Sequence, residues 1–221
     1  MKYKILLLFN FLFGYLMSQT GTLTDARDGK VYKTVVIGNS TWLSENLNTD
    51  KFRNGDLIPQ AKSTVEWVKF ASSKTPAWCY YNFDSKNGLI YGKMYNAYCM
   101  SDPRGLAPIG WHIPSDDEWK VLTDYLGDIF IAGGRMKEVG FSNWNSPNTA
   151  ASNSSGFSAI PGGLRHFDGT FLSLGNEAYW WSSTNTTPGS YWIRWLDFVS
   201  ENVNRGGHNG KRGIAVRCVK D

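Results

Sequence analysis

The sequence predicts an α+β domain with short, mostly antiparallel strands, two or three short helices and a long irregular loop region. Three observations lead to this prediction. Hairpin-like runs come first, helix-like runs follow and several short strands close the chain, an order typical of α+β folds. Apolar residues make up 42% of the chain and charged residues 19%, which excludes a disordered chain. No repeat of roughly 20 to 50 residues and no linker divides the sequence, so we expect one domain.

The N-terminus has the pattern of a secretory signal peptide. Two lysines precede an apolar stretch at 5–17, and the small residue Ser18 follows at a cleavage position. A membrane anchor needs about 20 apolar residues, so the shorter stretch favours cleavage. We therefore expect a signal peptide at 1–18 and one exported domain at 19–221, with no membrane span after cleavage. Because the peptide carries two lysines and no acid, its removal lowers the formal charge from +4 to +2.

The first half of the domain is predicted to contain two hairpins with a helix between them. An alternating apolar run over 31–43, interrupted by Gly-Asn, predicts the first hairpin. Ser63 stands three residues before a glutamate, the spacing of a capping box, which predicts a helix over 64–72. Aromatic runs at 77–81 and 90–98, separated by Asp-Ser-Lys-Asn-Gly, predict the second hairpin.

The second half is predicted to begin with helices and to end with strands. Ser115 and Glu118 form a capping box before an apolar helix face that Gly127 ends, and 132–139 is expected to form a shorter helix. Residues 142–156 hold five Ser and four Asn without a period, which predicts a long irregular loop of the kind that carries function. Short strands are expected at 157–160, 179–183, 191–198 and 214–219.

Five segments carry a resemblance to a known family. They are YGKMYN at 91–96, GWHIPSDDEW at 110–119, GFSAIPGG at 156–163, WWSST at 180–184 and VRCVK at 216–220. Together they resemble the Fibrobacter succinogenes major paralogous (FISUMP) domain, from about residue 28 to the end of the chain. Domains of this family occur in exported and surface proteins of bacteria, so the resemblance implies such a setting and no particular activity.

A more distant resemblance bears on the fold. The segment IPSDDEW at 113–119 looks like the start of a helix in formylglycine-generating enzymes, and GIAVR at 213–217 looks like their closing strand. That likeness implies a C-type-lectin-like mixed sheet in which the first and last strands pair, two helices flank it, and an irregular region carries any site. The oxidase chemistry of those enzymes needs two cysteines brought together in a cleft, whereas the cysteines here lie far apart in predicted strands.

The cysteines allow two interpretations. Cys79, Cys99 and Cys218 are an odd number, so at most one intrachain disulfide can form. No pair has the spacing of a zinc site or a CxxC motif. The other interpretation is three half-buried strand cysteines with one optional bridge, which the export expected here permits. For that bridge we predict Cys79 with Cys218, which would tie the middle of the chain to its end.

We predict no catalytic residue, no metal site and no cofactor. The three histidines are dispersed, and neither HExxH nor GxSxG occurs. The nearest match to a calcium-dependent sugar triplet, Ser-Pro-Asn at 146–148, lacks the acid that calcium prefers. A glycosidase needs two facing carboxylates, and Glu177, Asp197 and Glu201 are available, but only their presence recommends them.

The remaining candidate function is binding through aromatic side chains. Exposed Trp and Tyr rings stack on sugars and anchor protein partners. Alternation along 191–198 places Trp192 and Arg194 on one face. We predict that they form a surface site with Trp144 and Asn145 of the irregular loop. Three other tryptophans are expected in the core: Trp111, Trp119 and Trp181.

We therefore expect a secreted or periplasmic, non-catalytic binding module of the bacterial cell surface or envelope. Its ligand would be carbohydrate or another surface protein. Export and the low charge disfavour nucleic acid, so the basic residues near the C-terminus are expected on a solvated strand face: Arg205, Lys211, Arg212, Arg217 and Lys220. The alternatives are a carboxylate-based hydrolase or other enzyme on the same scaffold, and a purely structural envelope protein.

Overall fold

The computed structural model describes residues 19–221, so the predicted signal peptide lies outside the described residues. The described chain is an α+β domain with a five-stranded sheet, a three-stranded sheet and two small two-stranded sheets, all antiparallel. The predicted fold class is confirmed at this level. No helix within 19–221 is both long and apolar enough to cross a membrane.

The five-stranded sheet joins the two ends of the described chain. Its order is β1 (Thr20–Thr24), β2 (Val31–Ile37), β3 (Ser40–Leu43), β12 (Val219–Lys220) and β6 (Trp111–His112). The predicted hairpin of β2 and β3 is confirmed. The last strand pairs with β3 and β6 rather than with the first strand, because β1 adds to the outer edge of β2.

The three-stranded sheet consists of β9 (Glu177–Thr187), β10 (Ser190–Asp197) and β11 (Asn204–Asn209), with β10 in the centre. Strand β11 was not predicted. Strand β10 contributes side chains to two apolar clusters, because Ile193 belongs to one and Leu196 to the other.

The second predicted hairpin is only partly correct. Strands β4 (Trp78–Cys79) and β5 (Met94–Tyr95) do pair, but each has two residues. A 3₁₀ turn (Tyr81–Phe83) and helix α2 (Ser85–Tyr91) connect them in place of the expected turn. Helix α2 begins here because the Asp84 carboxylate accepts a hydrogen bond from the Lys86 amide at 2.9 Å. A second 3₁₀ turn (Ala97–Cys99) follows, and β7 (Leu164–Arg165) pairs with β8 (Phe171–Leu172).

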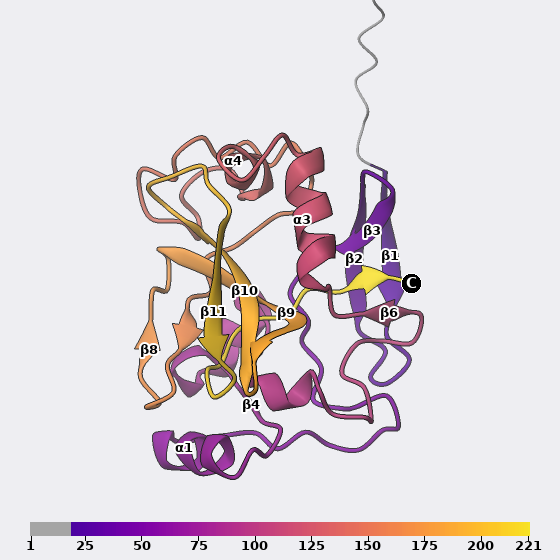
Figure 1. The fold of residues 1–221 in the computed structure, drawn as a ribbon, viewed down its shortest axis with the longest axis vertical. Helices are drawn as coiled ribbons and strands as arrows, with labels where there is room; N and C mark the ends of the chain where they lie inside the picture. The colour runs from indigo at the N-terminus through magenta and orange to yellow at the C-terminus, as the bar shows by residue number, and fades with distance from the viewer. Residues whose placement is uncertain (1–18) are drawn as a thin grey trace, which may run out of the picture.

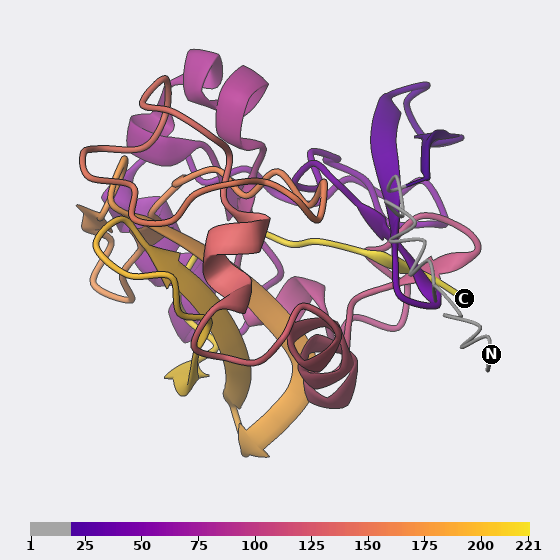
Figure 2. The same cartoon turned by 90° about the horizontal axis from the view of Figure 1, so that it is seen from above.

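Two of the other helices begin where their N-terminal caps predict. Helix α1 (Thr64–Ser72) is capped by Ser63, and α3 (Asp116–Tyr125) has the complete Ser115–Glu118 capping box. The short α4 (Ala132–Met136) precedes the irregular region 142–156, which contains no helix or strand. Helix α3 lies between the three-stranded and the five-stranded sheets, and α1 lies at the far end of the domain from α4 (Figures 1 and 2).

Tryptophans dominate the core. Trp42, Trp119, Phe157 and Trp180 form a cluster of rings, with centroids 5.0 Å apart for Trp42–Trp119 and 5.4 Å apart for Phe157–Trp180. The three tryptophans predicted for the core, Trp111, Trp119 and Trp181, are all buried. The prediction that these three rings lie in the core is therefore confirmed.

Three fully buried cations form no ion pair within the described residues: Lys137, Arg165 and Arg217. The Lys137 ammonium donates to the Asp197 and Ser200 carbonyls at 3.1 and 2.7 Å, and burial lowers its pKa to about 8. The Arg165 guanidinium lies against three aromatic rings, the closest centroid 4.4 Å away. Each of these cations holds irregular chain against a sheet or a helix.

Candidate functional site

The structure places Trp144 in the interior. Only 1% of its surface is exposed, and its indole nitrogen donates to the Ala159 carbonyl at 2.9 Å. Its neighbour Asn145 is exposed and donates to the Asn176 side chain at 2.9 Å. The irregular loop thus buries its largest side chain, and Trp144 offers no surface for a ligand.

The other two predicted site residues are engaged in a charge cluster. Arg194 is buried and donates to an Asp116 carboxylate oxygen at 2.6 Å. Arg205 pairs with the second oxygen at 2.8 Å and covers the Trp192 ring, its guanidinium carbon 3.3 Å from the ring centroid. No hydrogen bond or ring contact among the described residues joins this cluster to Trp144, so the predicted four-residue surface site is not formed.

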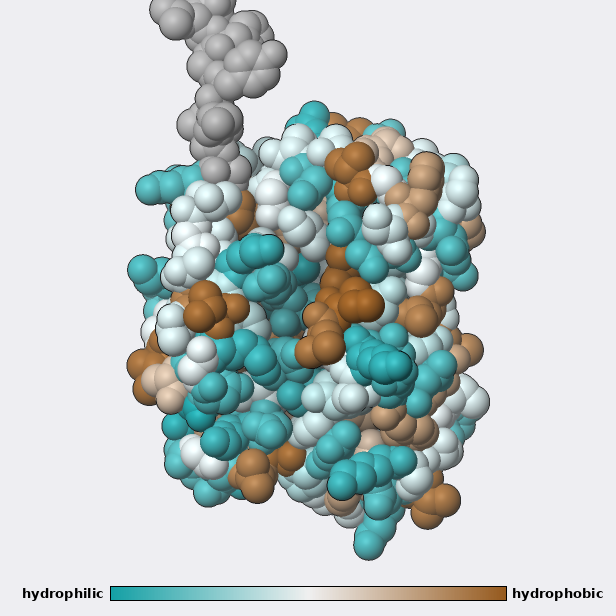
Figure 3. All heavy atoms as spheres, turned by 180° about the vertical axis from the view of Figure 1, so that it is seen from behind, coloured by the Kyte–Doolittle hydropathy of each residue, from teal (hydrophilic) through white to brown (hydrophobic). Residues whose placement is uncertain are grey.

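A cavity of about 480 Å³ opens elsewhere, between the β2–β3 hairpin, helix α2 and the loops around 138–160. Figure 3, the face opposite to Figure 1, shows a hollowed surface where hydrophobic side chains are bordered by hydrophilic ones. We call this cavity the hairpin pocket. Its lining consists of Lys30, Val31, Tyr32, Lys33, Ser44, Glu45, Asn46, Asn48, Gly88, Leu89, Ile90, Gly92, Glu138, Asn143, Ser158, Ile160 and Arg217.

Arg217 lies beneath the floor of the hairpin pocket. Its Nε donates to Asn46 Oδ1 at 2.8 Å, Nη1 donates to the Leu43 and Phe157 carbonyls, and Nη2 donates to the Ser158 carbonyl at 3.1 Å. Burial lowers the pKa of the guanidinium to about 9. The expectation that Arg217 lies on a solvated strand face was wrong, because this fork of donors ties β3 to the 157–158 segment.

Two asparagines form the fixed polar part of the floor. Asn46 also accepts from the Trp180 indole at 2.9 Å and donates to the Tyr91 carbonyl at 2.9 Å. Asn48 accepts from the Lys93 ammonium at 3.0 Å through both its side-chain and its backbone oxygen. Because these groups are already hydrogen-bonded, the floor is held in one arrangement before any ligand arrives.

Less constrained polar groups line the walls. Glu45 accepts from the Lys33 amide at 2.8 Å, while the Lys33 ammonium is 4.0 Å from its other oxygen. Glu138, which also lines the pocket, accepts from the Asn143 side-chain amide at 2.8 Å and forms no ion pair within the described residues. The Ser44 hydroxyl makes no hydrogen bond to another residue of the described chain. These side chains can bond a ligand without giving up a strong internal partner.

The rim of the hairpin pocket is apolar. Leu89 is 86% exposed, Ile90 51% and Val31 57%. In helix α2 the only buried residue is Gly88, which packs against the Tyr80 ring, so the helix turns its aliphatic side chains outward. This inverts the usual arrangement of a helix with one apolar face on the core.

Sequence reasoning missed the hairpin pocket because its walls come from segments far apart in the chain. One local feature could have indicated it. Gly92 in the YGKMYN segment has a φ of +75°, and a Cβ there would lie 3.1 Å from both the Asn46 side chain and the Leu47 carbonyl. A glycine in that position allows the chain after α2 to approach the floor.

The cysteines are free and buried, so the predicted Cys79–Cys218 bridge is absent. The physical reason is their separation into different apolar clusters, Cys79 with Trp67 and Cys218 with Leu43 and Trp111. Burial raises the pKa of Cys79 to about 11 and that of Cys218 to about 12. Little thiolate is therefore present near neutral pH, and thiol chemistry is disfavoured.

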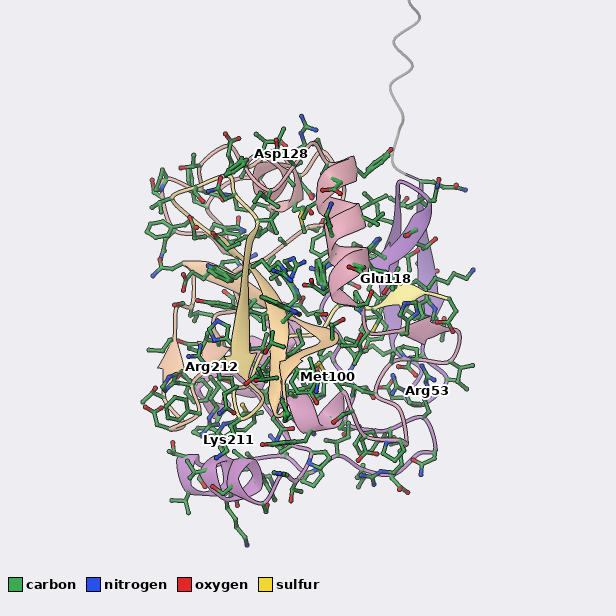
Figure 4. All side chains as sticks on the ribbon, in the orientation of Figure 1. Arg53, Met100, Glu118, Asp128, Lys211 and Arg212 are labelled. Carbon is green, nitrogen blue, oxygen red and sulfur yellow. The ribbon has the colours of Figure 1, made fainter. Side chains whose placement is uncertain are left out.

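His112 bridges two carboxylates. Its Nδ1 lies 2.6 Å from an Asp221 oxygen and its Nε2 lies 2.7 Å from a Glu118 oxygen. Glu118 lies at the start of α3 (Figure 4). Burial opposes the charged ring, but the bonds to Asp221 and Glu118 outweigh burial and raise the pKa of His112. Within 19–221 no group of three or more His, Cys, Asp or Glu side chains is arranged to hold a metal ion.

The carboxylates considered for a hydrolase do not line the hairpin pocket. Glu177 accepts from the Tyr179 hydroxyl at 2.6 Å, and Asp197 accepts from the amides of the turn that follows it. The pocket carboxylates, Glu45 and Glu138, were not predicted.

Comparison with known proteins identifies a family. The family model described as Fibrobacter succinogenes major domain matches residues 35–220. No curated protein and no solved structure matches the chain.

Proposed function

Because the chain belongs to the Fibrobacter succinogenes major domain family, whose description names no chemistry, we propose a function from the hairpin pocket itself. The protein is a non-catalytic binding module of the bacterial cell surface or envelope, exported by the signal peptide expected at 1–18. Its ligand is carbohydrate or another surface protein. The scaffold proposed for this role is C-type-lectin-like, with a closing strand beside the first hairpin and a long irregular region.

One observation carries the proposal: the hairpin pocket combines a rigid polar floor with accessible polar walls. Its volume of about 480 Å³ lies in the range usual for ligand pockets. The buried bonds of Arg217 and Asn46 fix the floor, so little ordering would be needed on binding. Binding-site walls of this kind supply orientation and specificity through a few polar groups, here Glu45, Glu138 and Asn143.

A second candidate is the carboxylate-based hydrolase. The observation in its favour is that Glu45 and Glu138 line the same pocket, as the two acids of a glycosidase must. A purely structural envelope protein is a third possibility, and for it the pocket would have no ligand.

The test is a glycan and cell-envelope protein array, run with and without calcium on the domain and on Asn143→Ala. Binding that is weaker in Asn143→Ala supports the binding module. Binding that is equal with and without calcium is expected, because no cluster of metal-binding side chains was found within the described residues. Release of sugar from a bound glycan, abolished in Glu45→Gln and Glu138→Gln, would instead establish the hydrolase. If no probe on the array binds in a way that changes with the pocket variants, the structural role is the one that remains.

A further inference from the structure

We infer that the hairpin pocket takes a polypeptide segment that presents an aliphatic side chain beside a lysine or arginine, an inference that rests on the proposed binding function. The first step is the rim. Leu89, Ile90 and Val31 line the pocket and expose their aliphatic side chains beside its polar groups. Aliphatic groups gathered at a pocket mouth and rimmed by polar residues are typical of a protein-interaction site.

The second step is the lack of an exposed aromatic ring among the residues that line the pocket. Sugar faces stack on exposed aromatic rings, which combine a large flat apolar area with a polar edge. The only aromatic residue among the lining residues is Tyr32, which is 2% exposed and whose hydroxyl accepts from the Asn48 amide at 3.0 Å. A buried ring offers no stacking face, whereas branched aliphatic side chains pack well against other aliphatic side chains.

The third step is charge. Of the three lining cations, Lys30 donates to the Asn48 carbonyl, and Arg217 is enclosed beneath the floor by its four acceptors. The third, Lys33, is exposed and lies 4.0 Å from Glu45, so these two opposite charges face each other. Of the lining acids, Glu138 has no ionic partner in the described chain and Glu45 has only the distant Lys33 ammonium. The accessible charge left without an opposite charge in the described chain is therefore that of Glu138. A basic side chain of the ligand complements it.

The fourth step is the backbone of the ligand. At the walls the Ser44 hydroxyl can donate or accept a hydrogen bond and the Asn143 side-chain oxygen can accept one, and an extended peptide offers N–H donors and carbonyl acceptors. The partner is thus a peptide with an aliphatic anchor for the rim, a basic side chain for Glu138, and main-chain groups for the polar walls.

The experiment selects a displayed library of random dodecapeptides on the immobilised domain and measures the enriched synthetic peptides by calorimetry. We expect enriched sequences to share an aliphatic residue next to Lys or Arg. Burial of one aliphatic side chain is worth about tenfold or more in affinity, so Leu89→Asp should weaken binding by at least that factor. Glu138→Gln should weaken binding about threefold to tenfold, with a smaller effect at high salt.

A matched control separates the pocket from general surface stickiness. Val121 is 62% exposed on α3 and does not line the pocket, so Val121→Asp should bind peptide as the unaltered domain does. Enriched peptides that lack a basic residue, or that bind Leu89→Asp at full strength, would overturn the inference. Glycan binding that depends on Asn143 but not on Leu89 would overturn it while sustaining the proposed function. If neither peptide nor glycan binds at the pocket, both the inference and the proposed function are overturned.

Discussion

Replacing Arg217 by methionine tests whether the buried guanidinium stabilises the fold. The change removes donors from Asn46 and from three carbonyls, and Asn46 keeps its bond from Trp180. The Phe157 and Ser158 carbonyls lose the side-chain donor that holds them, and each stranded carbonyl costs about 1–3 kcal/mol. Removing a charge buried without an ion pair returns part of that free energy. We expect a net loss of about 2–5 kcal/mol.

The assay is urea unfolding followed by tryptophan fluorescence, with the Arg205→Met variant as control. Arg205 also contacts a ring and a carboxylate, but its side chain is 45% exposed, so its loss should cost no more than about 1 kcal/mol. An Arg217→Met domain as stable as the unaltered one, or more stable, would refute the reasoning. It would mean that desolvation of the charge cancels its hydrogen bonds, as happens in some buried ion pairs.

The remaining predictions concern pH, thiols and one glycine. His112→Gln should lower the unfolding free energy by roughly 0.5 kcal/mol below pH 6.5, an effect that fades as pH rises through the raised pKa of His112; equal loss at all pH values would exclude a charge effect. Native protein at pH 8 should leave all three thiols unmodified by iodoacetamide and react fully in urea, as mass spectrometry would show, whereas native labelling would contradict their burial. Gly163→Ala should cost about 3 kcal/mol in thermal unfolding, because its φ is +63° and a Cβ would lie 2.3 Å from the Leu172 carbonyl; an unchanged melting temperature would show that β8 can shift.

Elements with local determinants were predictable from sequence. The Ser63 N-cap and the Ser115–Glu118 capping box place the starts of α1 and α3, because the bonded partners lie within four residues of chain. The β2–β3 hairpin follows from alternation and its Gly-Asn turn. In each of these the deciding interactions are neighbours in sequence.

Elements decided by distant partners were not predictable. Strand β11 has the sequence NRGGHN, which has low strand propensity, and it forms because β10 supplies the ladder. Trp144 was misplaced because its polar neighbours suggest an exposed loop, whereas its ring is the largest apolar surface that the loop can bury. The hairpin pocket needs β3, α2 and the 138–160 loops together, an arrangement that no single segment specifies.

The three buried cations have a consequence for how the folded domain is stabilised. Lys137, Arg165 and Arg217 fasten loops to the core through carbonyls and aromatic rings, where many exported domains use disulfides. None of these contacts is a disulfide that has to be formed by oxidation, and all three cysteines are free thiols. No disulfide therefore contributes to the stability of the described domain, and a reductant such as dithiothreitol should leave its unfolding free energy unchanged.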